Sequence, residues 1–368
     1  MNILLGKDPL KRYFNSYKYN IFRNVYVIGI TGSCGKTSTT LYLYNFLKYY
    51  FNDVCYIGTH KIYFNDIQIE TKNTTLEINI LKEYFDKYNI NPKIIVMEVS
   101  SIGINEARIN NFKFNILALT NLGRDHLDYH LNISNYHNVK LSFLNSCLYS
   151  DTIFINEKYK NKYNFTNRKI VFFKYNELLQ NQFDTINFNK ENMYLSYLIL
   201  KELRFNENEI IKNLNNIQLN NGRAEIIHYN NRKIIIDYAH HVESFEVILN
   251  DGNYNKVVIF GCGGNRDKDK RNIMGTIAEK YCKHVFITQD NSRNENVFNI
   301  INDITRNISN YKIIIKRDEA INYVLDNFPN IDVYILGKGD EIYIEENNNF
   351  IKFNDKDCVL KYIKNHTI

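Results

Sequence analysis

A glycine-rich turn directly after an apolar segment constrains this chain more than any other feature. Residues 31–38 read Thr-Gly-Ser-Cys-Gly-Lys-Thr-Ser and follow the apolar run 25–30. The residues after the turn, 41–47, read Leu-Tyr-Leu-Tyr-Asn-Phe-Leu and are typical of a helix. The pattern therefore predicts a strand, a turn and a helix, with the backbone N–H groups of the turn and the helix N-terminus directed at an anion.

Such a turn is typical of a nucleoside triphosphate site. Lys36 would contact the outer phosphates, and the Thr37 hydroxyl would hold Mg²⁺. The strict P-loop pattern is not met, because Ile30 stands where its first glycine belongs. The strand–turn–helix context therefore carries the prediction. The residues that we expect to bind the phosphates are Gly32, Ser33, Cys34, Gly35, Lys36, Thr37 and Ser38.

The composition is that of an intracellular globular protein. The chain has 368 residues, 44% of them hydrophobic and 23% charged, which favours two or three folded domains. The net charge of +6 is not gathered in a block, so the sequence gives no support for nucleic-acid binding. No apolar stretch approaches the roughly 18 residues of a membrane span. The six cysteines include no C-x-x-C pair, which indicates reduced thiols and a cytoplasmic protein.

Strand-like and helical patterns alternate along the chain, which predicts parallel sheets with crossover helices. The strand-like runs are 25–30, 94–99, 116–121, 152–155, 234–238, 257–260, 284–288, 312–316 and 333–336. The helical patterns include 75–88, 136–148, 193–203, 243–249 and 273–281. The polar stretch Leu214–Gly222 precedes a fresh set of strands. We therefore expect one domain over residues 1–220, with a short N-terminal extension over 1–24, and a second domain over 221–368.

Ionisable residues follow two strands of the first half, where open α/β sheets place their ligands. Glu98 ends the run 94–98, and a carboxylate beside a phosphate loop suits Mg²⁺. The run 116–120 leads into Asn121–His130, where His126 stands between two aspartates and is typical of a metal or phosphate site. The alternatives are a solvated strand-end Glu98 and, further along, a surface Lys140.

In order along the chain, these motifs resemble those of the Mur ligases, most closely the MurE type. The motifs of the first half are residues 31–37, Met97–Ser101, Thr120–His130 and Tyr136-x-x-x-Lys140. Those of the second half are Gly222–Glu225, Asp237–His240, Gly261–Asp267 with Lys270-Arg271, Asp290–Arg293 and Gly337–Glu341. The resemblance covers residues 24–360.

The resemblance implies a P-loop-type central ATPase domain with a mostly parallel sheet, followed by a Rossmann-like C-terminal domain. It implies an ATP-dependent carboxylate–amine ligase of peptidoglycan synthesis. In this reaction ATP converts a substrate carboxylate into an acyl phosphate, which the amino group of an amino acid attacks. Positioning and charge neutralisation do most of the work in such a phosphoryl transfer. Closure of the C-terminal domain excludes water from the acyl phosphate.

The resemblance also implies roles for single residues. The implied catalytic residues are Lys36, Glu98, His126 and Lys140, and the implied Mg²⁺ ligands are Thr37, Glu98, His126 and Lys140, with Asn121, Asp125 and Asp128 organising the site. Lys140 matches a lysine that CO₂ carbamylates, which requires an amine that can lose its proton. The further nucleotide-binding residues are Asn192, Arg223, Asp237 and His240.

The incoming amine is indicated by residues 290–293, Asp-Asn-Ser-Arg. They resemble the Asp-Asn-Pro-Arg motif of enzymes that add meso-diaminopimelate rather than lysine, where the arginine holds the distal carboxylate. Ser292 replaces proline and Asp340 replaces histidine, so a related zwitterionic amino acid stays open. The expected substrate-binding residues are Thr74, Thr75, Ser100, Arg108, Arg266, Asp290, Asn291, Arg293, Gly337 and Glu341.

The carboxylate donor is less defined. Only 24 residues precede the first strand, so we expect the N-terminal domain that binds the UDP-sugar in full-length relatives to be absent. The loop 74–77 lacks the usual Thr-Thr-Pro, and Ile102 stands where a histidine is usual. A peptide or UDP-sugar-peptide donor, a non-UDP donor of another pathway, and a partner protein that replaces the missing domain all stay open. A non-catalytic nucleotide-binding subunit is the remaining alternative, against which the presence of Lys36, Glu98, His126 and Lys140 argues.

Overall fold

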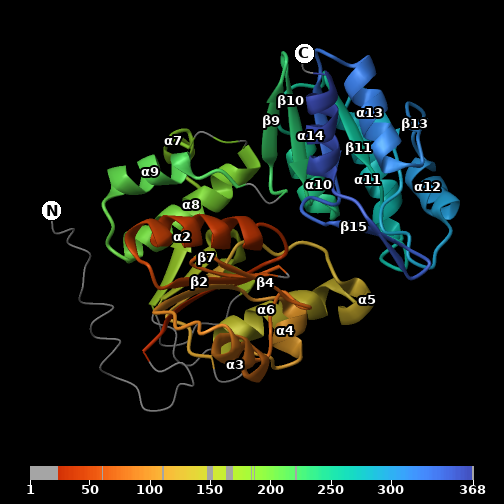
Figure 1. The fold of residues 1–368 in the computed structure, drawn as a ribbon. Coiled ribbons are helices and arrows are strands. Elements are labelled where there is room, and N and C mark those ends of the chain that lie inside the picture. Colours follow the sequence, from red (N-terminus) through yellow and green to blue (C-terminus); the bar gives the residue numbers. More distant parts are fainter. Residues whose placement is uncertain are drawn as a thin grey trace. The chain divides into compact units, whose positions relative to one another are not determined.

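The computed structural model describes residues 24–59, 61–109, 112–146, 152–162, 169–183, 185, 187–219 and 222–366. The chain forms two compact units, which divide between Ile217 and Gln218 except that Asn187 and Phe188 group with the second unit (Figure 1). Apart from Asn24, the expected N-terminal extension lies outside the described residues, as does Cys147.

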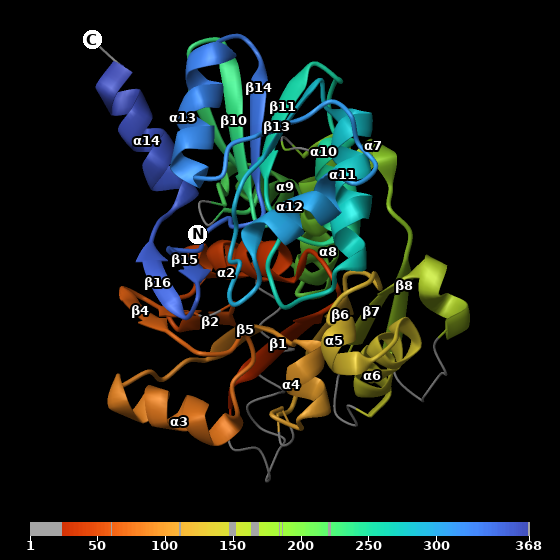
Figure 2. The same ribbon diagram turned by 90° about the vertical axis from the view of Figure 1, so that its right-hand side faces the viewer.

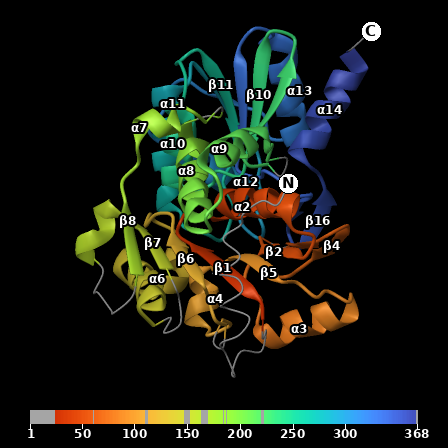
Figure 3. The ribbon, with the colours of Figure 1, turned by 90° about the vertical axis from the view of Figure 1, so that its left-hand side faces the viewer.

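The first unit is built on an eight-stranded sheet with the order β4-β3-β2-β5-β1-β6-β7-β8. Its strands are β1 (Tyr26–Thr31), β2 (Val54–Gly58), β3 (Lys61–Phe64), β4 (Ile67–Glu70), β5 (Ile94–Glu98), β6 (Ile116–Leu119), β7 (Thr152–Asn156) and β8 (Lys169–Phe173). Figure 3 shows this sheet from β8 at one edge to β4 at the other. β3 is antiparallel to both of its neighbours, β2 and β4, and the other neighbouring strands of the sheet are parallel. Ile30 pairs with Glu98 and Thr31 with Leu119, so the carboxyl ends of β5, β1 and β6 meet at one edge.

Helices cover both faces of this sheet. They are α2 (Lys36–Tyr50), α3 (Ile78–Lys87), α4 (Ser101–Asn105), α5 (Leu127–His130), α6 (Ile133–Ser146), α7 (Glu177–Gln180), α8 (Asn187–Glu202) and α9 (Glu207–Asn216), with a 3₁₀ turn at Glu157–Lys162. Helices α2, α8 and α9 lie on one face, and α3, α4 and α6 on the other (Figure 1). The central strands β1, β2 and β5 are buried along their whole length, as strands of a parallel sheet covered on both faces must be.

The second unit has a six-stranded sheet with the order β13-β12-β11-β14-β10-β9, in which only β9 is antiparallel. Its strands are β9 (Glu225–Tyr229), β10 (Arg232–Asp237), β11 (Lys256–Phe260), β12 (His284–Ile287), β13 (Lys312–Ile313) and β14 (Asp332–Leu336). Helices α10 (Val242–Leu249), α11 (Asp269–Tyr281) and α12 (Val297–Thr305) pack on one face, and α13 (Arg317–Asn327) and α14 (Asp355–His366) on the other (Figure 2). A separate hairpin consists of β15 (Tyr343–Glu346) and β16 (Asn349–Lys352).

The expected α/β class with mostly parallel sheets is confirmed. The boundaries shift where side chains compete with the local pattern. The helix expected over 75–88 begins only at Ile78, because the buried Thr75 is tied to the end of β5. The strand expected over 312–316 is paired only at Lys312–Ile313. Among the described residues, no helix combines the length and the apolar character that crossing a bilayer requires.

Candidate active site

The turn between β1 and α2 depends on two glycines. Gly32 and Gly35 have φ angles of +144° and +79°, which residues other than glycine rarely adopt. A Cβ atom on Gly32 would lie 1.9 Å from Thr120 Oγ1, and one on Gly35 would lie 2.2 Å from Asn192 Oδ1. The turn therefore packs against both the end of β6 and helix α8, which brings the predicted nucleotide residue Asn192 to the loop.

Hydrogen bonds fix the same turn to the chain that follows β6. Asn121 accepts from Cys34 N at 2.9 Å and donates to Cys34 O at 3.1 Å. The Ser33 hydroxyl accepts from Gly123 N at 2.8 Å. Lys36 Nζ donates to the carbonyls of Gly32 and Ser33 at 2.8 and 3.0 Å, so the ammonium lies across the mouth of the turn. A cation held over a glycine turn at a helix N-terminus is suited to a polyphosphate.

Glu98 is fully buried, and its two carboxylate oxygens have different surroundings. Oε1 accepts from the Tyr56 hydroxyl and from Thr59 N, both at 2.9 Å. Oε2 accepts from the Thr37 hydroxyl at 3.0 Å, and the Thr59 hydroxyl lies 3.2 Å from both oxygens. The strand β2 comes so close that a Cβ atom on Gly58 would lie 2.3 Å from Oε1. The carboxylate is therefore fixed through Oε1, with Oε2 directed at Thr37.

This donor set fits Mg²⁺. The ion binds through one or two protein carboxylates together with phosphate oxygens and water, and the Thr37 hydroxyl beside Glu98 Oε2 supplies hard oxygen donors next to the phosphate turn. In the described parts of the chain, no three His, Cys, Asp or Glu side chains gather as a softer metal such as zinc would require.

His126 follows β6, and its ring centroid lies 6.5 Å from that of Tyr136. It adopts a left-handed conformation (φ +50°), and its Nε2 lies 3.1 Å from Asp125 Oδ2. The backbone N–H of His126 donates to Asp125 Oδ1 at 2.6 Å. The predicted acidic and imidazole groups are thus joined to each other, with the imidazole half-exposed. The side chain of Asp128 lies outside what the structure describes.

Lys140 is one of the most buried residues of the first unit, with 1% of its surface exposed. Its Nζ lies 3.7 Å from the centroid of the Tyr136 ring. Burial lowers the pKa of this amine well below its ordinary value, and the nearby charge of Lys36 lowers it further. Lys140 is therefore not the solvated surface lysine that composition alone suggests, and its burial favours the neutral amine over the ammonium.

The residues expected to bind the carboxylate donor make contacts within the chain. The buried Thr75 hydroxyl donates to Glu98 O at 3.0 Å and accepts from Ser100 N at 2.9 Å. The Ser100 hydroxyl caps α4 by accepting from Gly103 N. Arg108 donates to Thr75 O at 3.1 Å and pairs with Glu106. Thr74 is half-buried, and the substrate roles of these residues stay predictions.

In the second unit, the residues expected to face the nucleotide surround the end of β10. Asp237 is buried, which raises its pKa to about 6 although Arg223 and two backbone N–H groups favour the charged form. These N–H groups, of Ala224 and Ala239, donate at 2.6 and 2.7 Å. The Arg223 guanidinium lies 4.3 Å from the centroid of the Tyr238 ring, and His240 Nδ1 donates to Tyr238 O.

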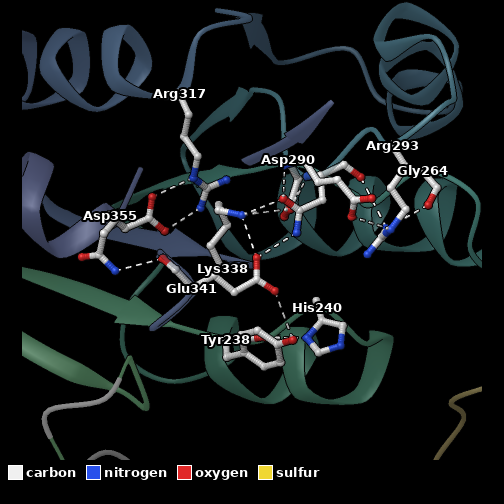
Figure 4. A network of polar contacts seen from close by, with 12 residues as sticks. Tyr238, His240, Gly264, Asp290, Arg293, Arg317, Lys338, Glu341 and Asp355 are labelled. Carbon is white, nitrogen blue, oxygen red and sulfur yellow. Dashed lines mark hydrogen bonds and ion pairs between the residues drawn. The ribbon is translucent and has the colours of Figure 1, made fainter. Parts of the chain in front are cut away.

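Several residues expected to bind the amine form a buried polar cluster around Lys338 (Figure 4). Lys338 Nζ donates to Glu341 Oε2 at 2.7 Å and to Asn291 Oδ1 at 3.1 Å, and lies 3.7 Å from Asp290 Oδ1. Asn291 Nδ2 donates to the same Glu341 oxygen at 2.8 Å. Burial raises the pKa of Asp290, but Lys338 and Arg317 outweigh this effect and the net shift is downward. The cluster therefore holds Asp290 as a carboxylate.

Arg293 lies beside this cluster in a left-handed conformation (φ +52°). Its Nη1 donates to Gly264 O at 2.9 Å. A Cβ atom on Gly263 would lie 3.0 Å from Arg293 Nη1 and 3.9 Å from Arg266 Cγ, so the two arginines flank this glycine. Gly337 (φ +110°) backs onto Asp290, where a Cβ atom would lie 2.9 Å from Oδ2.

Four residues at these sites were not predicted from the sequence: Tyr56, Thr59, Lys338 and Glu345. Lys338 stands inside the quoted motif 337–341, and its position between two glycines was an available signal. Tyr56 and Glu345 lie on strands without a motif. Only their contacts reveal them: Tyr56 donates to Glu98, and Glu345 forms an ion pair with Arg293.

Comparison with known families gives two matches. Residues 30–216 match the Mur ligase middle domain. Residues 222–339 match the family described as Mur ligase, glutamate ligase domain.

Individual proteins agree with these matches. The UDP-N-acetylmuramoyl-L-alanyl-D-glutamate–2,6-diaminopimelate ligase of Wigglesworthia glossinidia brevipalpis is 32% identical over 93% of this chain and 77% of its own length. An enzyme of the same description from Clostridium acetobutylicum is 33% identical over 92% of this chain and 78% of its own.

Solved structures show the same fold. A structure of a UDP-N-acetylmuramoyl-L-alanyl-D-glutamate–2,6-diaminopimelate ligase aligns with a TM-score of 0.61 at 24% identity, covering 93% of this chain and 79% of the other. The folylpolyglutamate synthase of Mycobacterium tuberculosis aligns with a TM-score of 0.66 at 12% identity, covering 86% and 89%.

Proposed function

The chain belongs to the Mur ligase family, and we propose that it joins 2,6-diaminopimelate to UDP-N-acetylmuramoyl-L-alanyl-D-glutamate at the expense of ATP. As a Mur ligase it is an ATP-dependent amide-forming enzyme of peptidoglycan synthesis. The observation that carries the proposal is the placement of Lys36, Thr37 and Glu98 around one phosphate turn. The reaction uses ATP and a UDP-sugar, which are cytoplasmic metabolites, and we place the enzyme in that compartment.

Activation of the donor belongs to the first unit. Lys36 and the N–H groups of the turn 32–35 would hold the phosphates, so that negative charge developing on the transferred phosphoryl group meets fixed positive groups. Thr37 and Glu98 would hold Mg²⁺, which neutralises phosphate charge when it is bound. Asn192, which contacts the turn, would fix the nucleotide in the first unit. Arg223, Asp237 and His240 stay the nucleotide residues predicted for the second unit.

Lys140 would act as a carbamate. Its neutral amine would attack the carbon of CO₂: an N–C bond would form as one C–O π bond breaks and leaves its electron pair on oxygen, and the amine proton would pass to water. The product is an anion where an ammonium would otherwise stand. Burial and Lys36 both disfavour the ammonium there, and they outweigh Asp125, which favours it. The carbamate and His126 would then support a second Mg²⁺.

The amine would bind in the second unit. Arg293 would hold the distal carboxylate, with Arg266 on the other side of Gly263, and Glu341 would receive the distal ammonium. Lys338 holds Glu341 in place through the 2.7 Å hydrogen bond to Oε2. A pocket with both charges selects a zwitterionic side chain, because a substrate lacking either group leaves a pocket charge unpaired.

The proposal is tested by ATP-dependent ligation with purified protein, diaminopimelate and either the UDP-sugar dipeptide or a UDP-free dipeptide. Lys36→Ala should abolish amide formation and leave the protein folded, because the Lys36 ammonium bonds to loop carbonyls at the surface of the turn. Lys48→Ala, on the exposed face of the same helix, is the matched control and should keep wild-type turnover. Turnover of Lys36→Ala within a few-fold of wild type would contradict the assignment.

A further inference from the structure

Glu345 forms an ion pair with Arg293. Glu345 lies on β15, and its Oε2 is 3.2 Å from Arg293 Nε. The two side chains are 21% and 25% exposed, so the pair is shielded from most of the solvent. The motif that identified Arg293 covers residues 290–293, and Glu345 lies outside every motif of the sequence.

The same strand holds the backbone of Arg293. Arg293 N donates to Glu345 O at 3.0 Å, and Asn347 N donates to Arg293 O at 2.7 Å. An isolated bridge joins Arg293 to Glu346. A residue other than glycine persists in the left-handed region when its surroundings over-determine it, and such residues cluster at functional sites. The backbone hydrogen bonds with Glu345 and Asn347 constrain the main chain of Arg293, and the ion pair with Glu345 constrains its side chain.

The strand is also tied to the ammonium side of the pocket. Asn291 Oδ1 accepts from Glu345 N at 2.9 Å, while Asn291 Nδ2 donates to Glu341 Oε2. One amide side chain therefore sets the positions of both Glu341 and the strand that carries Glu345. Asn291 therefore links Glu341, the group proposed for the distal ammonium, to the strand that holds Arg293, the group proposed for the distal carboxylate.

The contacts of Arg293 divide its N–H groups. Nε faces Glu345, and Nη1 donates to Gly264 O at 2.9 Å, with Asn291 O at 3.4 Å. Within the described residues of the second unit, Nη2 has no hydrogen-bond partner. Nη2 is therefore the guanidinium nitrogen that remains for a substrate carboxylate, which an arginine binds through its N–H groups.

We propose that Glu345 is a positioning residue for amine specificity. It pairs with Nε of Arg293 and so leaves Nη2 for the distal carboxylate of the incoming amino acid. This inference rests on the proposed amine site and names a further residue that makes it selective. A long arginine side chain that is already ordered loses less conformational freedom when the substrate binds, and the gain is realised only with a substrate that has the carboxylate. Lysine, which lacks it, receives no benefit.

The test compares Glu345→Ala, Glu345→Gln and Glu346→Ala. For each variant, steady-state kinetics give KM and kcat with diaminopimelate and with lysine as the amine, together with the KM for ATP, and thermal unfolding gives its stability. Glu346 is the matched control, because successive strand residues point to opposite faces and it has the same charge.

For Glu345→Ala we expect the KM for diaminopimelate to rise about 10- to 100-fold, the usual consequence of a misplaced binding group, with kcat and the KM for ATP within about threefold of wild type. The KM for lysine should not change, so the preference falls by the same factor. Glu345→Gln should recover part of the loss, because an amide oxygen can still face Nε. Glu346→Ala should match wild type.

The possible failures are distinguishable. If wild type prefers diaminopimelate and Glu345→Ala keeps that preference, the role of Glu345 is wrong and the proposed function stands. If wild type ligates lysine and diaminopimelate equally well, both the amine assignment and the role of Glu345 are overturned. An equal loss for both amines, or a loss shared by Glu346→Ala, would show a structural role only and would also overturn the inference.

Discussion

At the scale of single residues, the two carboxylate oxygens of Glu98 have different partners. Its Oε1 is taken by the Tyr56 hydroxyl and Thr59 N, and its Oε2 faces Thr37. A buried carboxylate is costly unless donors surround it, and here the donors also decide which oxygen faces the phosphate turn. Partners that orient a metal ligand matter nearly as much as the ligand itself.

Tyr56→Phe should therefore weaken the metal site without removing a ligand. We expect the Mg²⁺ concentration needed for half-maximal binding of a fluorescent ATP analogue to rise about tenfold, since losing such a supporting group typically costs 10- to 100-fold in metal affinity. Tyr44→Phe is the control, because the Tyr44 ring lies 5.9 Å from the Tyr56 ring in the same aromatic cluster. An unchanged Mg²⁺ titration for Tyr56→Phe would contradict the role of this hydroxyl.

Lys140 gives a prediction with a defined pH dependence. Because burial lowers the pKa of its amine, the neutral form persists at lower pH than in an exposed lysine. With ¹³C-bicarbonate, wild type should show a carbamate resonance near neutral pH that disappears on acidification, as the amine becomes protonated. Lys140→Ala should lose the resonance and most activity, and short carboxylic acids should restore part of the activity. Lys48→Ala should keep the resonance; its persistence in Lys140→Ala would refute the assignment.

At the scale of elements, the loops after β11 and β12 lie against each other with no space between them. Gly264 N donates to Asn291 O at 2.8 Å, and a Cβ atom on Gly264 would lie 1.9 Å from Ser292 O. Backbone cannot yield as a flexible side chain can. The two loops must therefore separate if position 264 has a side chain, and Arg293 then loses its contact with Gly264 O.

Gly264→Ala should consequently act on both stability and amine binding. We expect a loss of about 1–3 kcal/mol in the free energy of unfolding, the usual cost of overpacking, and a raised KM for the amine. Gly252→Ala is the control for amine binding: its φ of +76° strains an alanine and lowers stability, but a Cβ atom there would meet nothing closer than Tyr334 Oη at 3.8 Å, so the KM should not change. Denaturant unfolding and steady-state kinetics measure the two effects. A wild-type KM for Gly264→Ala would show that the loops adapt.

The elements also show where reading the sequence succeeds and where it stops. The strand–turn–helix at residues 26–50 was predictable because its signals are local: an apolar run, glycines and a helical pattern. The hairpin β3–β4 was not predicted, since two four-residue strands offer little periodicity. The partners of Glu98 and Arg293 come from positions 39 and 52 residues away, such as Thr59 and Glu345, and only folding brings them together.

At the scale of the whole molecule, the residues proposed for phosphate and metal binding and those proposed for the amine belong to different units. Lys36, Thr37 and Glu98 belong to the first, and Arg293 and Glu341 belong to the second. Changes in the amine pocket should then leave the use of ATP intact, while changes at the phosphate turn should slow ligation of every amine by the same factor.

Arg293→Ala tests this division. The variant should lose the preference for diaminopimelate over lysine, by about 2–5 kcal/mol in transition-state terms, because one partner of a shielded charge pair is removed. The KM for ATP should stay within about twofold of wild type, since a contact absent from the nucleotide site contributes nothing to that affinity. Arg306→Ala, an exposed arginine of the same unit, serves as the control. Competition between the two amines, each labelled in turn, measures the preference directly. If Arg293→Ala raised the KM for ATP as much as the KM for diaminopimelate, amine selection and ATP use would not be separable, and this division of the reaction would be wrong.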